Sequence, residues 1–263
     1  MAAIERVLLT GDVHGNTSWM VGHVLKQAKR HGCQLVLQLG DFGIWPGKDG
    51  QHYLEVLNRE YKHAGIPLWF IDGNHEDFDQ LYALPLDGDG RRPVREFITH
   101  IPRGHRWQWA GREMLACGGA SSIDADLRTP GRSWWPQEAI TDDDVARCIA
   151  GGGTAVMFSH DIQLEVQLTD PHEQVGAPDY VMQGIRANRT RLQRIADATL
   201  PSLQVHGHCH VPYDETFTRK GVPLRIVGLN CDSRAASEPN GHCAVLDLAT
   251  LAEDVREALL VVD

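Results

Sequence analysis

The sequence contains no uninterrupted apolar run of about 18 residues, the length that a membrane-spanning helix needs, so no membrane span is expected. The apolar stretch near its start, residues 7–9, is also far too short for the hydrophobic core of a secretory signal peptide. Since the sequence shows no export signal, we expect a cytoplasmic protein.

The sequence also lacks paired cysteines. Its 6 cysteines are widely spaced and form no Cys-x-x-Cys pair. In a chain without an export signal, this spacing argues against a disulfide framework. We expect the thiols to be small buried side chains.

An excess of basic residues is missing as well. The chain has 25 Lys and Arg against 35 Asp and Glu, a formal net charge of −10. This balance argues against binding along a duplex nucleic acid, which needs a basic surface. A small nucleotide is not excluded, because bound divalent cations reverse the local field at a site. With no repeat and no low-complexity linker, residues 1–263 are expected to form a single domain.

Hydrophobic patterning predicts an α/β fold. Strand-like runs alternate with amphipathic helical segments over the first eighty residues, which is typical of a parallel sheet covered by helices. We expect strands at 6–10, 35–39 and 67–71 and helices at 18–29 and 53–63. Further strands are expected at 97–101, 106–109, 113–117 and 154–158. The strand-like runs of the last sixty residues, at 203–205, 216–218, 224–227 and 244–248, suggest a second sheet packed on the first. We also expect helices at 142–149 and 185–198, and long loops at 118–138 and 160–184.

Metal-binding residue types directly follow five of the strand-like runs. Ligands of open α/β sheets bind beyond the carboxyl ends of the strands, so segments far apart in the sequence are expected to meet there. The five segments are Gly11-Asp12-Val13-His14-Gly15, Gly40-Asp41, Gly73-Asn74-His75-Glu76, Ser159-His160 and Gly207-His208-Cys209-His210.

Two of these segments carry candidate ligands two positions apart, Asp12 with His14 and His208 with His210. In an extended segment such side chains point to the same side, so each pair is expected to reach one region. Cys209 would then point away, and we interpret it as a bystander although sulfur binds zinc. His206 either contacts the site or simply ends a buried strand.

The mixture of carboxylate, imidazole and amide donors suits Mn, Fe or Zn. Asp41 is the natural bridge between two cations, because a carboxylate has two oxygens and Gly40 lets the backbone approach closely. Two cations about 3.5–4 Å apart would clamp a phosphate and turn a shared water into hydroxide. Each segment alone is common in loops, but the combination predicts a hydrolase of phosphate esters.

From Gly11 to His210, the motifs together resemble those of the calcineurin-like metallophosphoesterase family. The resemblance implies a four-layer α/β/β/α sandwich of two packed mixed sheets flanked by helices. It also implies two divalent metal ions that share Asp41. One would be bound further by Asp12, His14 and His210, and the other by Asn74, His160 and His208.

The resemblance further places His75 beside the metals as a catalytic residue that is not a ligand. It would stabilise the transferring phosphoryl oxygen or protonate the leaving alkoxide, tasks for which a group with a pKa near neutrality is suited. The alternative is that His75 only orients Asn74 or caps a helix.

The second motif departs from that of the family's protein Ser/Thr phosphatases, Gly-Asp-x-x-Asp-Arg-Gly. Ile44 and Trp45 stand where those enzymes have the Asp that orients the catalytic histidine and the Arg that grips phosphate. The Gly-His-x-His ending resembles the phosphodiesterase and nuclease branches instead. We therefore predict a phosphodiesterase, with a phosphomonoesterase or divergent protein phosphatase as the alternative. A non-catalytic scaffold is a minor alternative, because every ligand position and His75 are filled.

Aromatic and basic residues near the motifs predict a small substrate, with nucleotides among the candidates. Aromatic faces beside the bridging carboxylate could stack a nucleobase, and arginines of the 118–138 loop could grip a second phosphate. We interpret this loop as a lid over the substrate, although its tryptophans could simply pin it to the core. The predicted substrate contacts are Phe42, Trp45, Arg128, Arg132 and Trp134.

Manganese is the expected metal, with Fe, Zn and Ni as alternatives. The segment after residue 224 is expected to complete a sheet. Within it, Asn230 and Asp232 follow a strand and could approach the site.

Overall fold

The computed structural model of the chain describes residues 3–166, 177–234, 236 and 238–263. Within these residues, two mixed sheets pack face to face. The 7-stranded sheet has the order β13-β12-β1-β2-β3-β5-β4, and the 6-stranded sheet the order β10-β11-β9-β8-β7-β6. The strands of the first are β1 (Arg6–Thr10), β2 (Leu35–Leu39), β3 (Leu68–Ile71), β4 (Arg92–Arg95), β5 (Ile98–His100), β12 (Cys243–Asp247) and β13 (Leu259–Val261). Those of the second are β6 (Arg106–Trp109), β7 (Arg112–Cys117), β8 (Val156–Ser159), β9 (Leu203–His206), β10 (Tyr213–Arg219) and β11 (Val222–Gly228).

Within each sheet, the strands that precede the predicted site pair in parallel with one another. β1, β2 and β3 pair in parallel in the first sheet, and β7, β8 and β9 do so in the second. The carboxyl ends of parallel strands share one edge of a sheet, which places the loops that follow them side by side.

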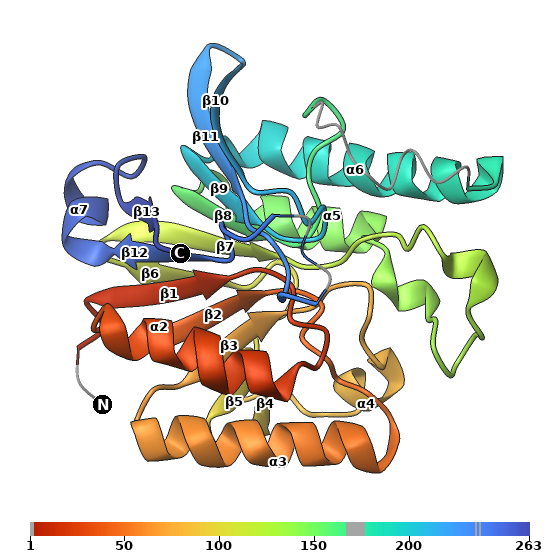
Figure 1. Cartoon of the computed structure of the whole chain (residues 1–263). Helices are drawn as coiled ribbons and strands as arrows, with labels where there is room; N and C mark the ends of the chain where they lie inside the picture. The colour runs from red at the N-terminus through yellow and green to blue at the C-terminus, as the bar shows by residue number, and fades with distance from the viewer. Residues whose placement is uncertain (1–2, 167–176, 235, 237) are drawn as a thin grey trace.

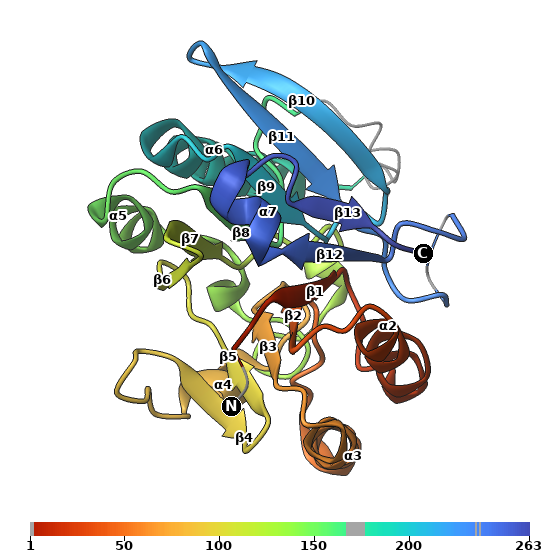
Figure 2. The same ribbon diagram turned by 90° about the vertical axis from the view of Figure 1, so that its left-hand side faces the viewer.

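Helices cover the outer face of each sheet (Figures 1 and 2). α1 (Thr17–Trp19), a π-helical turn (Met20–Val24) and α2 (Leu25–Arg30) form one continuous helix, which lies with α3 (Gly47–Ala64) on the first sheet. α5 (Asp142–Ala150) and α6 (Asp179–Thr199) lie on the second sheet. The expected four-layer α/β/β/α sandwich is therefore confirmed. The run at 244–248, expected in the second sheet, instead pairs with β1 as β12 of the first sheet.

Three apolar clusters hold the layers together. One fills the space between the sheets and joins Leu9 and Leu37 of the first sheet to Phe158 and Val205 of the second. The other two lie between each sheet and its helices. Because the central strands are buried on both faces, they read as continuous apolar runs in the sequence. Truncating a fully buried leucine such as Leu37 to alanine costs about 2–5 kcal/mol in proteins generally.

Helix starts differ most from the sequence expectations. α3 begins at Gly47 and α6 at Asp179, each six residues before the expected start, and neither has a side-chain hydrogen bond at its N-cap. Asp49 and Asp179, the acidic residues of the first turns, were the remaining start signals, and without a capping side chain they did not mark the first residue. The expected loop 160–184 is thus shorter, and its part at 167–176 lies outside the described residues.

Short elements were also missed. They are α4 (Phe78–Tyr82), β4, α7 (Leu248–Glu253) and β13. Each spans six residues or fewer, which is too short for a hydrophobic period to show. No helix in the described part of the chain is both long and apolar enough to cross a membrane.

Candidate metal centre

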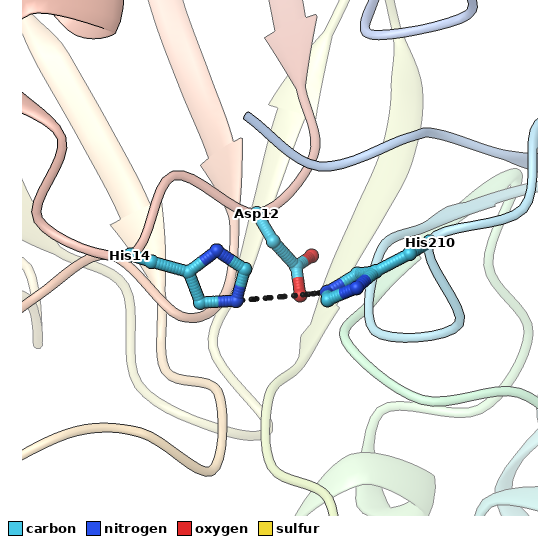
Figure 3. A group of neighbouring side chains, drawn as sticks. All are labelled: Asp12, His14 and His210. Carbon is cyan, nitrogen blue, oxygen red and sulfur yellow. Dashed lines mark hydrogen bonds and ion pairs between the residues drawn. The ribbon is translucent and has the colours of Figure 1, made fainter. Parts of the chain in front are cut away.

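The candidate ligands lie in the loops that follow β1, β2, β3, β8 and β9, so both sheets contribute to one site. The carboxylate of Asp12 lies between the rings of His14 and His210 (Figure 3). Its Oδ2 is 3.0 Å from His210 Nε2 and 3.9 Å from His14 Nε2. Its Oδ1 accepts the backbone N–H of His208 at 2.8 Å. One carboxylate thus orders the loops after β1 and β9.

Asp41 holds the remaining loops. Its Oδ1 accepts the backbone N–H groups of Asn74 and His75, each at 2.8 Å, and lies 3.4 Å from His160 Nε2. Its Oδ2 is 3.7 Å from His14 Nε2. The Asp41 carboxylate is therefore close to side chains from the loops after β1, β3 and β8.

The backbone conformation at the site differs from the extended one that we expected. His14, Asp41, His208 and His210 all have positive φ, between 45° and 64°. The pairs Asp12 with His14 and His208 with His210 therefore reach one region through left-handed turns and not along extended segments. Left-handed conformations are uncommon for residues other than glycine and cluster at functional sites.

Two glycines allow the loops to approach this closely. A Cβ on Gly40, which has φ +98°, would lie 2.1 Å from His160 Nδ1. A Cβ on Gly207 would lie 2.2 Å from Asp12 Oδ1. Any other residue at these positions would push the ligand side chains apart, which explains the glycines of the second and fifth motifs.

The negative charges of the buried carboxylates favour positive charge nearby. Burial alone lowers the pKa of His160, but Asp41 and Asp12 raise it to about 10. Burial likewise lowers the pKa of His14, but the hydrogen bond of Asp232 and the charges of Asp12 and Asp41 raise it to about 9. Without a metal, the histidines themselves must carry the compensating charge. Divalent cations bound by carboxylate, imidazole and amide donors would neutralise the same negative charges, so the residues present fit such ions.

Asp232 was expected only to approach the site, and nothing in the sequence indicated its contact with His14. Its Oδ1 lies 3.1 Å from His14 Nδ1, and its Oδ2 accepts hydrogen bonds from Asn16 Nδ2 and Arg234 Nε at 2.5 and 2.9 Å. By accepting the Nδ1 hydrogen, the buried carboxylate turns the Nε2 lone pair of His14 toward Asp12 and Asp41.

The Asn74 amide is oriented by a second buried pair. Its Nδ2 donates to Ser122 Oγ at 3.0 Å, which leaves Oδ1 facing His160 Nε2 at 3.1 Å. Ser122 in turn donates its hydroxyl hydrogen to Glu138 at 2.8 Å. The amide oxygen, the better metal ligand of the two ends, is thereby directed into the site.

His75 lies at the rim of the cluster, with Nε2 4.0 Å from Asp41 Oδ2. Its Nδ1 accepts a hydrogen bond from Arg128 Nη2 at 2.9 Å. Burial lowers the pKa of His75, and the Arg128 charge lowers it further, against the opposing charge of Asp41. The carboxylate of the adjacent Glu76 is held by backbone groups. It accepts the backbone N–H groups of residues 42–44 at 2.7–3.1 Å and so fixes the loop after β2.

A cavity of about 210 Å³ opens over the cluster. It is lined by His14, Asp41, Asn74, His75, Ser121, Ile123, Asp124, Ile185, Arg189, His208 and His210. A second cavity of about 310 Å³ shares His75 with the first and is lined otherwise by Trp45, Pro46, Glu76, Asp77, Arg128, Arg132, Ser133 and Trp135. His75 therefore lines both cavities.

Only some of the predicted substrate contacts line a cavity at the site. Trp45, Arg128 and Arg132 line the second cavity. The prediction for Phe42 is wrong, because its ring is fully buried and stacks on Phe70 with centroids 4.3 Å apart. Trp134 lines neither of these two cavities, whereas its neighbour Trp135 lines the second.

Two side chains near the fifth motif face away from the metal cluster. Cys209 is fully buried among Ile162, Leu224 and Ile226, as expected of a bystander. His206 is also fully buried, hydrogen-bonds to the Tyr213 hydroxyl, and has its pKa lowered to about 4 by burial. It therefore ends a buried strand and does not reach the cavity.

Solved structures similar to the chain include a predicted phosphoesterase of Streptococcus pneumoniae (12% identity, 93% of this chain and 83% of that one, TM-score 0.36). Others are a hypothetical protein of Thermus thermophilus (14%, 86% and 75%, TM-score 0.41) and a protein serine/threonine phosphatase of Saccharomyces cerevisiae (14%, 99% and 80%, TM-score 0.41). None of the curated proteins compared with the chain matches it. The family model of the calcineurin-like phosphoesterases matches residues 5–212, and the chain therefore belongs to this family of metal-dependent phosphoester hydrolases.

Proposed function

We propose that the protein is a phosphodiesterase that hydrolyses a small diester, with nucleotides as the leading class. The observation that carries this proposal is that His75 lines both cavities. A diester carries a group on each side of its phosphorus, and a phosphate bound over the metal cluster would have room for the second group beside Trp45.

The second cavity has the chemistry of a subsite for a flat, anionic group. Trp45 is 39% exposed, and its indole is fixed by a hydrogen bond from Nε1 to the His75 carbonyl at 3.2 Å. An aromatic face held in this way can stack a nucleobase without losing much side-chain entropy. Arg132 makes no ion pair within the described residues, so its charge is available to an anion.

The candidate ligands are divided between two cations. We assign Asp12, His14 and His210 to one cation, Asn74, His160 and His208 to the other, and Asp41 to both. The central place of the Asp41 carboxylate, within 4 Å of imidazole nitrogens of His14, His75 and His160, supports the bridging role. Two bound divalent cations would supply Lewis-acid activation of the phosphoryl group and of a water molecule.

His75 is the proposed catalytic residue. Its Nε2 faces the same cavity as the ligands but lies at the rim, which suits contact with a substrate oxygen. Asp41 holds His75 at this rim, because the Asp41 carboxylate accepts the backbone N–H of His75. A positioned proton or hydrogen-bond donor of this kind contributes about 10²–10⁴-fold to rate.

Hydrolysis of phosphoproteins is disfavoured by the loop after β2. Ile44 is 1% exposed and belongs to the core between the first sheet and its helices, so it offers nothing to His75 or to a phosphate. Trp45 places an indole where the family's protein phosphatases have an arginine. The site thus lacks two groups on which those enzymes depend.

The test is to strip the protein with chelator and to restore Mn, Fe, Zn, Ni or Mg singly. Turnover of a chromogenic diester, a chromogenic monoester, cyclic nucleotides, dinucleotides and single-stranded oligonucleotides is then compared. We expect diester turnover to exceed monoester turnover and manganese to restore it best. Monoester turnover far above diester turnover would refute the diesterase, and no turnover with any metal would favour the scaffold.

Three further expectations stand as proposals beside this one. The substrate is small, and a long duplex is not bound, because the chain is acidic. The protein acts in the cytoplasm, which fractionation of cells would check. Residues 1–263 act as one domain, which cooperative unfolding in a single transition would support.

A further inference from the structure

The hydrogen-bond partner of His75 Nδ1 is unusual for a catalytic histidine, because it is a cation. Arg128 Nη2 lies 2.9 Å from Nδ1. The loop after β2 offers no carboxylate in its place, since Ile44 is buried in the apolar core. The residue that determines which ring nitrogen of His75 carries hydrogen is therefore an arginine of the 118–138 loop.

The chemistry of the pair allows one arrangement. A guanidinium carries only hydrogen-bond donors, so the nitrogen that it contacts must be an acceptor. In a neutral imidazole with Nδ1 as the acceptor, the hydrogen resides on Nε2. Nε2 is the nitrogen that faces Asp41 Oδ2 at 4.0 Å and the cavity over the cluster. The hydrogen of His75 thus points to where a substrate oxygen would lie.

We propose that Arg128 is a positioning residue that holds His75 in the tautomer with its hydrogen on Nε2, so that the ring donates a hydrogen bond to the phosphoryl group. This inference rests on the proposed function of the site. It also selects between the two roles considered for His75. Stabilisation of a phosphoryl oxygen needs only this donor, and it leaves the Arg128 contact intact throughout the reaction.

Arg128 is itself held in place by buried groups. Its side chain is 12% exposed, Nη1 donates to Ser122 Oγ at 2.7 Å, and Nη1 lies 3.6 Å from Glu138 Oε2. Ser122 donates both its backbone N–H and its hydroxyl to the Glu138 carboxylate, at 2.7 and 2.8 Å. Because Glu138 is 2% exposed, this anchor does not depend on the surface.

Ser122 links this arrangement to the metal cluster. A hydroxyl offers one hydrogen and two lone pairs. Ser122 gives its hydrogen to Glu138 and accepts from Asn74 Nδ2 and Arg128 Nη1. The same hydroxyl therefore orients a candidate metal ligand and the arginine that orients His75. The 118–138 loop, interpreted from the sequence as a lid, supplies the groups that hold the catalytic side chains.

The direct test is the tautomer itself. Protein labelled with 15N histidine and loaded with zinc, which is diamagnetic, is examined by long-range 1H–15N correlation, and the His75 signals are assigned by their loss in His75→Gln. We expect the hydrogen on Nε2 in the wild type and a mixture of tautomers in Arg128→Met. Arg132→Met, a change on the same loop, should leave the His75 pattern unchanged. A wild-type ring with its hydrogen on Nδ1 overturns the proposal without any variant having to fold.

Kinetics separate positioning from direct contact with substrate. Partners that orient metal-binding histidines are worth about 10- to 100-fold, and by analogy Arg128→Met should lower kcat by about that factor with little change in KM. In a His75→Ala background the same substitution should cost less than about 3-fold, because its target is gone. Arg128→Lys, which keeps a donor, should recover part of the loss. An equal loss with and without His75 means that Arg128 acts on the substrate and overturns the proposal.

The two proposals fail in distinguishable ways. The kinetic cycle is run on whichever ester the protein hydrolyses fastest, so a preference for monoesters refutes the diesterase and leaves the cycle valid. The tautomer measurement needs no turnover. Metal content is measured for every variant. We expect equal metal in Arg128→Met and wild type, because Arg128 bonds to Ser122 and the Asn74 amide keeps its own hydrogen bond to the Ser122 hydroxyl.

Discussion

Replacing Asp232 by asparagine should weaken metal binding although Asp232 is not itself a candidate ligand. Its Oδ1 lies 3.1 Å from His14 Nδ1, and its Oδ2 accepts from Asn16 and Arg234. An asparagine can present only one oxygen. Either its amide nitrogen faces the two donors on the Oδ2 side, or it faces His14 Nδ1 and favours the wrong ring tautomer. In both cases the Nε2 lone pair of His14 is less well directed toward the cluster.

The magnitude follows from the hydrogen bond that this change disturbs. Hydrogen-bonded partners of metal-binding histidines are worth about 10- to 100-fold in affinity, or about 1.4–2.7 kcal/mol. Asp232 is 1% exposed, so the upper half of this range is expected. Arg234→Met is the matched control. It removes a partner of the same carboxylate, an arginine whose side chain is 63% exposed, and such surface pairs contribute about 0–1 kcal/mol.

The assay is a titration of the stripped protein with manganese, followed by calorimetry and by recovery of ester hydrolysis. We expect Asp232→Asn to need 10- to 100-fold more metal for half-maximal activity and to approach wild-type kcat at saturation, since the ligands themselves are unchanged. Arg234→Met should stay within about 5-fold of wild type. If Asp232→Asn bound manganese as tightly as wild type, the orienting role of Asp232 would be refuted.

Three further predictions concern the centre and its surroundings. Asp41→Asn keeps an oxygen for the two backbone N–H groups that Oδ1 now accepts, so the chain should fold, but kcat/KM should fall about 10²–10⁴-fold with loss of metal measured by elemental analysis. Trp45→Ala should raise KM about 5- to 100-fold for diesters with a flat group and much less for aliphatic diesters, in steady-state kinetics. Burial raises the pKa of Glu138 from 4.5 to about 7, against the hydrogen bonds from Ser122 and the charge of Arg128. Between these pH values the folded chain thus keeps a proton that the unfolded chain has released. As the pH rises from 4.5 to 7, the free energy of unfolding of the wild type should therefore fall by up to roughly 3 kcal/mol relative to that of Glu138→Gln, measured by denaturant titration at each pH.

The parts of the fold that could be predicted are those with a repeated local pattern. The apolar runs of β1 and β2 predicted both strands with their observed ends, because each is buried on both faces. The strand–helix alternation predicted the parallel part of the first sheet. The starts of α3 and α6 could not be found, since no capping side chain marks them and residues 47–52 carry little of the apolar period.

The candidate site was predictable because its residues follow strands that carry strong patterns. Whether a side chain near the site faces substrate was not predictable in the same way. Phe42 is adjacent to Asp41 in sequence, but its ring points into the core between the first sheet and its helices. Ser122 and Glu138 are 16 positions apart in a loop that contains two short 3-10 helices, and nothing in the local sequence shows that they are bonded to each other. Such contacts depend on tertiary packing alone.

The expectation that the paired ligands lie on extended segments was wrong, and the reason shows how the two aspartates work. Each carboxylate uses one oxygen to hold backbone groups. The Oδ1 atoms of Asp12 and Asp41 accept backbone N–H groups of His208, Asn74 and His75 and so hold the loops in place. The Oδ2 atoms face the imidazoles of His210 and His14, and Asp41 Oδ1 also lies 3.4 Å from His160 Nε2. Left-handed residues cost about 1–3 kcal/mol each, and these backbone hydrogen bonds offset part of that cost. Because one oxygen of each aspartate is already committed to the fold, the geometry of the site is set by the chain before a metal arrives.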